Sequence, residues 1–273
     1  MDSLRPPIMG AFRLRKPGWR AQVKRQLIRW LYEHGYILAL RGPLAAEQFS
    51  TETLSICRRV AAYTMTPPER VSVLIDAVNY VARQGVPGAM VECGVWRGGS
   101  MMAIALALLA REDERDLYLF DTYEGLTAPT ERDVDLAGRS QVDLWSAEDR
   151  GAVAALTEVQ RALATTGYSA GRLHFVKGKV EDTLPDQAPE TIALLRLDTD
   201  WYESTKHELE TLYARLVPGG ILMIDDYGHF RGAQEAVDEY FGDSGPFLAR
   251  IDYAARVAIK PPQAEPNRVA RRR

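Results

Sequence analysis

The 273-residue chain has little of what would give it an unusual fold. It holds only two cysteines, Cys57 and Cys93, too few and too far apart for a zinc site or a disulfide framework. Its longest apolar run, 101–110, is shorter than the roughly 18 residues that a membrane span requires. The N-terminus lacks the apolar segment of a secretory signal. These absences predict a protein that folds around its own core in a reducing cytoplasm, with no transmembrane segment.

A large excess of charge is also absent, because the net charge is −3. The charge is nevertheless uneven: residues 1–36 carry +6 and residues 260–273 carry +4, which leaves −13 for the residues between them. Enzymes that act on nucleic acids usually have basic surfaces around their sites, so this acidic body predicts no nucleic-acid substrate. The basic ends either bind RNA, DNA or anionic lipid, or they are ordinary solvated segments, which we favour.

The composition divides the chain into three parts. Residues 1–45 are predicted to form a basic arm that contains an amphipathic helix over 19–33. Such a helix can lie on a membrane surface or dock on its own domain or on a second subunit, and its short apolar face favours docking. Residues 46–260 have the pattern of one domain. Residues 261–273 are polar, basic and contain proline, which predicts a disordered tail.

Short apolar segments alternate with helical patterns through the domain. Strands are expected at 89–93, 117–121, 173–177, 192–197, 221–224, 247–252 and 256–260. Helices are expected on both sides of a break at 66–69 and then over 100–111, 147–165, 203–216 and 232–241. This alternation predicts an α/β fold with a parallel sheet that has helices on both faces.

Several turn residues give the predicted boundaries. We expect Thr66 to cap the helix that follows it, and 218–220, Pro-Gly-Gly, to end the helix over 203–216. Residues 124–146 form a long polar stretch between strands. A loop of that length inside a compact domain is usually a lid or a binding loop, so we expect it to cover the site.

Acidic residues end or directly follow the predicted strands. In open α/β sheets, ligands bind at the carboxyl ends of the strands. The alignment of acids at this one edge therefore predicts the binding site. They are Glu92, Asp121, Asp198, Asp200, Asp225 and Asp226.

The first strand leads into a glycine-rich turn, 94–99, and then into a helix N-terminus, where backbone N–H groups can hold an anion. The glycines are spaced G-x-x-x-G-G, which is neither the dinucleotide fingerprint nor a P-loop. An NAD-dependent oxidoreductase is therefore disfavoured, and a tight turn without a ligand is the alternative. Asp121, which ends the second strand, suits the two hydroxyls of a ribose. The two features together predict a nucleoside-containing cofactor.

Asp198 and Asp200 follow one strand, and Asp225 and Asp226 follow a strand expected beside it, about 5 Å away. Carboxylates this close repel one another unless a cation or a proton lies between them. Oxygen ligands without histidine or cysteine favour Mg²⁺ over Mn²⁺ or Ca²⁺. The alternative is that Asp200 and Asp226 each only cap a helix.

Six segments resemble the macrocin O-methyltransferase family over about residues 55–241. They are 63–66 (YTMT), 91–100 (VECGVWRGGS), 120–126 (FDTYEGL), 181–185 (EDTLP), 197–205 (LDTDWYEST) and 224–228 (IDDYG). The resemblance implies a class I S-adenosyl-L-methionine-dependent methyltransferase fold, which is a Rossmann-like seven-stranded sheet with its last strand antiparallel. It also implies Mg²⁺-dependent methylation of a sugar hydroxyl on a glycosylated natural product, as in antibiotic biosynthesis, by a homodimer or larger homo-oligomer.

The same resemblance implies roles by position. Asp200 would be the general base, and Asp198, Asp225 and Asp226 would bind the metal. The cofactor would be bound by Met65, Glu92, Gly94, Trp96, Arg97, Gly98, Gly99, Ser100, Asp121, Gly178 and Asp182. Family members often carry an aromatic residue where this chain has Lys179. A catechol or other vicinal diol as the acceptor, and a non-enzymatic binding module, are the alternatives.

Overall fold

The computed structural model describes residues 49–148 and 150–262, all of which belong to one compact unit that begins at Ala46. The predicted arm and helix at the N-terminus, and the tail beyond residue 262, lie outside the described residues. Within the part of the chain that is described, no helix is long and apolar enough to span a membrane.

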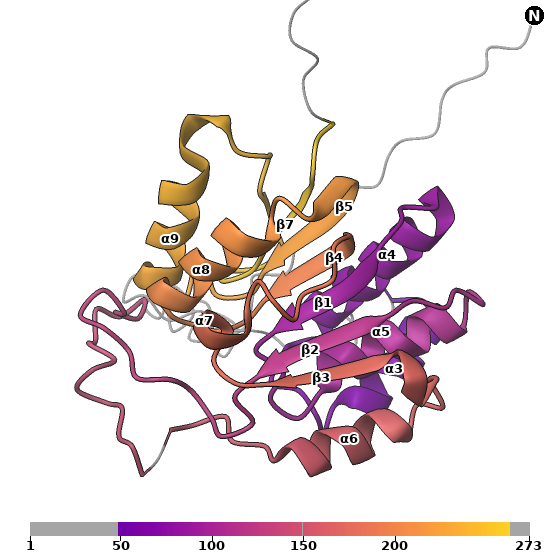
Figure 1. The fold of residues 1–273 in the computed structure, drawn as a ribbon, viewed down its shortest axis with the longest axis horizontal. Helices are drawn as coiled ribbons and strands as arrows, with labels where there is room; N and C mark the ends of the chain where they lie inside the picture. Colours follow the sequence, from indigo (N-terminus) through magenta and orange to yellow (C-terminus); the bar gives the residue numbers. More distant parts are fainter. Residues whose placement is uncertain (1–48, 149, 263–273) are drawn as a thin grey trace, which may run out of the picture. The chain divides into compact units, whose positions relative to one another are not determined.

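A seven-stranded sheet with the strand order β3-β2-β1-β4-β5-β7-β6 forms the centre of this unit (Figure 1). Strands β1 to β5 pair in parallel, and β7 runs antiparallel to both β5 and β6. The prediction of a seven-stranded sheet with its last strand antiparallel is confirmed. The strands are β1 (Ala89–Cys93), β2 (Leu117–Asp121), β3 (Leu173–Lys177), β4 (Ile192–Leu197), β5 (Leu216–Ile224), β6 (Ala249–Arg250) and β7 (Arg256–Ile259).

Helices cover both faces of the sheet, so every residue of β1 and of β4 is buried. One face packs against α3 (Thr51–Val60), α4 (Pro68–Gln84), α5 (Gly99–Leu109) and α6 (Leu156–Ala164). The other face packs against α7 (Val180–Thr183), α8 (Tyr202–Leu212) and α9 (Arg231–Phe241). Alternate residues of each strand point into the two cores. Two short 3₁₀ turns, Ala170–Arg172 and Gly242–Ser244, complete the described elements.

Several expected boundaries are wrong, and three of them have a clear structural reason. Pro67, not Thr66, is the N-cap of α4. The helix expected over 147–165 begins only at Leu156, because Gly151 and Ala152 have positive φ angles of 64° and 43°. The 218–220 segment does not end a helix, since α8 already ends at Leu212 and this segment lies inside β5.

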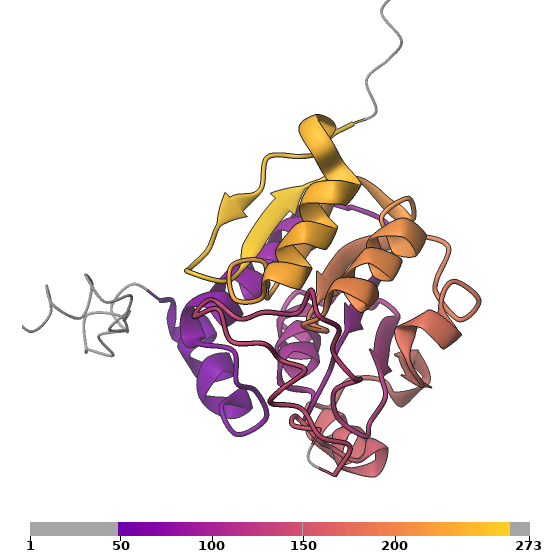
Figure 2. The ribbon, with the colours of Figure 1, turned by 90° about the vertical axis from the view of Figure 1, so that its left-hand side faces the viewer.

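The long connection over 122–155 is fixed to the helices of one face and crosses the side of the unit (Figure 2). Its anchor is Asp133, which is 0% exposed. The Asp133 carboxylate accepts hydrogen bonds from Tyr202 N (2.8 Å) and from Thr130 N (2.7 Å). It therefore acts as an N-terminal cap for α8 supplied by a distant segment. Trp201 Nε1 adds a bond of 2.8 Å to the Thr127 carbonyl oxygen.

We predict that Asp133→Ala lowers the free energy of unfolding by roughly 1–3 kcal/mol, because the α8 terminus and Thr130 both lose a buried acceptor. Urea denaturation measures this change, and limited proteolysis reports release of the 122–155 segment. Asp143→Ala is the control, since Asp143 is an exposed acid of the same segment. Equal stability of the two variants would show that Asp133 does not anchor the connection.

Candidate functional site

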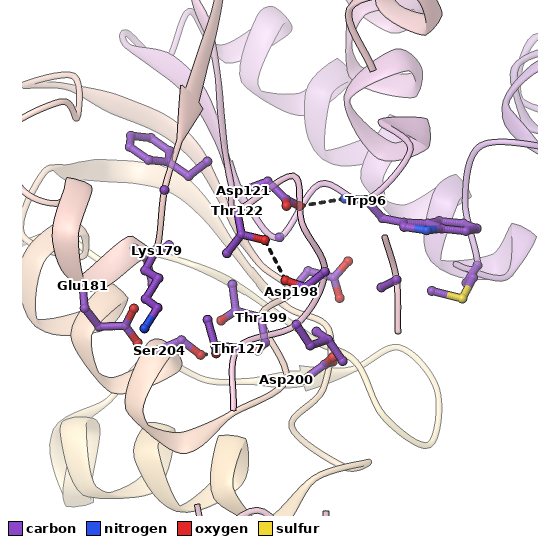
Figure 3. Close-up of a pocket in the computed structure, with 18 residues that line it drawn as sticks. Trp96, Asp121, Thr122, Thr127, Lys179, Glu181, Asp198, Thr199, Asp200 and Ser204 are labelled. Atoms are coloured by element: carbon purple, nitrogen blue, oxygen red, sulfur yellow. Dashed lines mark hydrogen bonds between the residues drawn. The ribbon is translucent and has the colours of Figure 1, made fainter. Parts of the chain in front are cut away.

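A cavity of about 710 Å³, which includes open space at its mouth, lies at the carboxyl ends of β1 to β4. Figure 3 shows Trp96 at one end of it and Lys179 and Glu181 at the other, with Asp198 and Asp200 between them. The location agrees with the expected binding edge of an open α/β sheet. Of the predicted site residues, the wall includes Met65, Gly94, Trp96, Asp121, Gly178, Asp198 and Asp200.

Asp121 ties the ends of β1 and β2 together at the cavity wall. Its Oδ2 accepts hydrogen bonds from Val95 N (2.7 Å) and Trp96 N (2.9 Å), and its Oδ1 accepts one from Tyr123 N (2.6 Å). A carboxylate has about four acceptor positions, and these bonds occupy three of them. Asp121 is therefore held rigidly and retains one acceptor position for a ligand hydroxyl.

The glycine-rich turn allows close packing of backbones. Gly94 has a φ of +81°, and a Cβ there would lie 1.9 Å from the Asp198 carbonyl oxygen. A Cβ on Gly99 would lie 2.6 Å from the Tyr63 carbonyl oxygen. Gly94 thus brings the ends of β1 and β4 together, while Gly99 admits the segment that carries Met65 to the cavity mouth. Glycine suits both positions because another part of the backbone approaches closely there, in addition to any role of the turn in binding an anion.

Six of the predicted cofactor-binding residues lie outside the wall of this cavity. Gly98, Gly99 and Ser100 form the start of α5, where Gly99 and Ser100 are buried. Arg97 pairs with Glu158 at 2.6 Å on the surface. Asp182 is exposed and lines neighbouring hollows. Glu92 is 1% exposed and faces an arginine.

That arginine, Arg196, is the centre of a buried ion-pair network. It contacts Glu92 Oε1 (2.6 Å), Asp198 Oδ2 (2.5 Å) and Asp225 Oδ1 (2.6 Å). Glu92 and Arg196 are directly paired in the β1–β4 register. Arg70, from α4, contacts the other oxygen of Asp225 at 2.5 Å.

Our sequence reasoning missed both arginines of this network. A signal existed for Arg196, because a charge inside the buried run Leu194-Leu195-Arg196-Leu197 requires a partner. No local pattern identifies Arg70, which lies 155 residues before Asp225. Several other wall residues were not assigned a role of their own, although 125–127 lie in the segment expected to cover the site. They are Phe120, Thr122, Gly125, Leu126, Thr127, Ala152, Val180, Glu181, Thr199 and Ser204.

Asp198, Asp200 and Asp226 form the group that can hold a metal ion. Each offers an oxygen, and these oxygens all lie within 4.8 Å of one another. Asp226 Oδ2 is buried and has no hydrogen-bond partner within the described chain. The set differs from the predicted ligands, because Asp200 takes part and Asp225 does not. Both oxygens of Asp225 already contact guanidinium groups.

Strand alternation explains why the adjacent acids differ. Met223 points into the core beneath α4, and Ile224 points into the opposite core. Asp225 continues this alternation, since its N–H still bonds the Leu197 carbonyl oxygen at 2.9 Å. It therefore points toward Arg70, and Asp226 points away toward the other acids.

Helix capping does not account for Asp200 and Asp226. Neither the N-cap of α8 nor that of α9 has a side-chain cap bond of its own, and α8 is capped by Asp133 instead. Asp200 has a φ of +68°, a left-handed conformation that costs an aspartate of order 1 kcal/mol or more. Such strain concentrates at functional sites, where the surrounding structure maintains it.

The electrostatics of these acids favour a cation or bound protons. Burial first, and then the charge of Asp198, raises the pKa of Asp200 to about 7. Burial and the neighbouring carboxylates also raise the pKa of Asp226. Burial raises the pKa of Glu92 to about 8, against the opposing effect of Arg196. A divalent ion between the three aspartates would offset the mutual repulsion that adds to the effect of burial on the pKa values of Asp200 and Asp226.

Comparisons with known proteins identify the family of this chain. A family model described as Macrocin-O-methyltransferase (TylF) matches residues 25–255. The 8-demethyl-8-(2,3-dimethoxy-alpha-L-rhamnosyl)-tetracenomycin-C 4'-O-methyltransferase of Streptomyces olivaceus is 36% identical over 188 residues, which cover 67% of this chain and 69% of that protein. The mycinamicin III 3''-O-methyltransferase of Micromonospora griseorubida is 34% identical over 66% of this chain and 70% of its own.

A solved structure of the O-methyltransferase NovP is similar to the fold with a TM-score of 0.65 and 28% sequence identity. The match covers 73% of this chain and 82% of that chain. The sheet order, the cavity at the strand ends and the extent of the family match all lead to one assignment. The chain belongs to the macrocin O-methyltransferase family and is an S-adenosylmethionine-dependent O-methyltransferase.

Proposed function

We propose that this enzyme methylates a sugar hydroxyl of a glycosylated natural product and requires a divalent metal, Mg²⁺ or alternatively Mn²⁺. The observation that carries the proposal is the group of three aspartates at the edge of the cavity. The tetracenomycin relative is named as a 4'-O-methyltransferase of a rhamnosyl compound, which supports a sugar acceptor over a catechol.

The residues of the cavity suit S-adenosylmethionine. Asp121 retains an acceptor position for a ribose hydroxyl, and Gly178 lets the chain turn at the far end of the wall with a φ of +149°. Asp198 and Asp200 in the wall provide negative charge, which suits the positive sulfonium. The cofactor supplies the electrophilic methyl group, and the chain supplies orientation, which is a large part of such catalysis.

The oxygen atoms of the three aspartates also suit a Mg²⁺ ion. All three donors are carboxylate oxygens, the ligands that Mg²⁺ prefers, and the unpartnered Oδ2 of Asp226 is the kind of buried atom that a cation would satisfy. A divalent ion held there would lower the pKa of an acceptor hydroxyl. We assign Asp198 and Asp226, with one oxygen of Asp200, to this ion.

The second oxygen of Asp200 is the proposed proton acceptor. A sugar hydroxyl is a weak nucleophile, so a carboxylate must take its proton as its oxygen attacks the methyl group. Asp200 lies in the cavity wall, and the left-handed turn fixes its direction. Arg70 would hold Asp225, which in turn holds Arg196, so that these residues support the site from behind without contact to substrate. The anchored 122–155 segment would exclude water on the other side.

We predict that Asp200→Asn lowers kcat by about 100-fold or more, because the amide cannot accept the proton. S-Adenosylhomocysteine should bind with a dissociation constant within about twofold of that of the unchanged enzyme, as measured by calorimetry. Asp186→Asn, at an exposed acid away from the cavity, is the control and should leave both quantities unchanged. Full turnover by Asp200→Asn would exclude this residue as the base.

We also predict that stabilisation by Mg²⁺ increases with pH. The pKa of Asp200 rises from 3.8 to about 7 on folding, so between these values the unfolded chain loses its proton before the folded chain does. The free energy of unfolding of the metal-free protein therefore falls as pH rises through this window, by up to about 1.4 kcal/mol per pH unit for each such group.

Thermal unfolding at pH 5.5 and pH 8, with Mg²⁺ or with a chelator, measures this effect. Mg²⁺ should raise the Tm more at pH 8, where the ligands are deprotonated. Asp226→Asn should abolish the Mg²⁺ shift and keep the shift with S-adenosylhomocysteine. A Mg²⁺ shift that is equal at both pH values, or absent at pH 8, would contradict the assigned metal site.

A further inference from the structure

A buried carboxyl group on α8 has no part in the reaction proposed above. Glu208 is 0% exposed and does not line the cavity. Its Oε1 accepts a hydrogen bond from Thr199 Oγ1 at 2.9 Å, and its Oε2 is buried without a hydrogen-bond partner within the described chain. Burying a carboxyl group costs free energy unless its interactions compensate. The hydrogen bond from Thr199 is the described interaction that offsets part of this cost.

Thr199 is the middle residue of the turn that carries Asp198 and Asp200. Its carbonyl oxygen accepts hydrogen bonds from Trp201 N (2.8 Å) and from Ser204 Oγ (3.3 Å). With the side-chain bond to Glu208, this turn is attached to α8 and its leading residue by three hydrogen bonds. The attachments act on the residue directly before Asp200, whose φ of +68° must be held by its surroundings.

The charge of Glu208 fits a supporting role. Burial raises its pKa well above the usual range, against the opposing effect of the Thr199 bond, and the charges of Glu181, Asp198 and Asp200 raise it further. These effects disfavour a further negative charge behind the aspartates, while the carboxyl group still accepts the hydrogen bond from Thr199.

We propose that Glu208 is a positioning residue, whose hydrogen bond to Thr199 Oγ1 fixes the 198–200 turn so that Asp198 and Asp200 meet Asp226 around a divalent cation. This inference rests on the proposed function. Partners of metal ligands typically change metal affinity by about 10–100-fold when they are removed. Glu208 acts one step further back, because it holds the turn and touches neither the metal ligands nor the cofactor cavity.

The experiment titrates the purified protein with Mn²⁺ alone and measures free Mn²⁺ by electron paramagnetic resonance. Thr199→Val removes the hydroxyl and keeps the shape of the side chain. We expect it to raise the Mn²⁺ dissociation constant by about 10-fold or more. Glu208→Leu, at a residue outside the cavity wall, should have the same effect and keep the affinity for S-adenosylhomocysteine within about twofold. The double variant should bind Mn²⁺ no more weakly than either single variant.

Two controls separate this role from general stability. Glu208→Gln keeps a neutral acceptor for Thr199 and should bind Mn²⁺ within about threefold of the unchanged protein. Thr211→Val removes a hydroxyl on the same helix that bonds only backbone oxygens there, and it should also bind normally. If Glu208→Leu does not fold, the comparison of Thr199→Val with Thr211→Val still decides the question.

Normal Mn²⁺ affinity in Thr199→Val would overturn the positioning role and leave the proposed function intact. A parallel loss of Mn²⁺ and S-adenosylhomocysteine affinity in Glu208→Leu would also overturn it, because that pattern indicates a structural role only. Failure of the unchanged protein to bind Mn²⁺ would instead contradict the metal site itself, and this inference with it.

Discussion

The ion-pair network around Arg196 is the constraint on which the site depends. The carboxyl edge of the sheet concentrates acids, and burying them together without cations would be strongly unfavourable. Arg196 compensates Glu92, Asp198 and Asp225, and Arg70 adds a second positive charge on the side of α4. With these partners in place, Asp200 and Asp226 are the members of the three-aspartate group for which the described residues show no guanidinium contact.

The arrangement divides the acids between two tasks. Those that follow the strand alternation toward α4 are neutralised by arginine and hold the strand ends together. Those that turn toward the cavity stay close to one another, with raised pKa values and one buried oxygen without a partner. Asp198 belongs to both groups, because it contacts Arg196 and also faces Asp200 and Asp226. The protein thus stabilises its scaffold and leaves three carboxylates that could hold a cation at the same sheet edge.

Much of the fold follows from local patterns. Apolar runs that end in an acid located β1, β2 and β4 to the residue, because buried parallel strands read as continuous apolar segments. Boundaries that depend on backbone dihedrals or on distant partners did not follow. The start of α6 depends on two positive φ angles, and the cap of α8 comes from Asp133, 69 residues away from Tyr202.

The site, like the fold, could be predicted in part. The sequence placed the acids at one edge, but it could not assign Asp225 to the arginines, since that contact joins α4 to the end of β5 across 155 residues.

The proposed metal site is tested most directly by a crystal structure with S-adenosylhomocysteine and Mn²⁺, with anomalous diffraction data collected to locate the manganese. We predict a manganese peak between Asp198, Asp200 and Asp226, beside the cofactor sulfur. A cofactor-loaded crystal without a peak there, or with manganese bound elsewhere, would contradict the account.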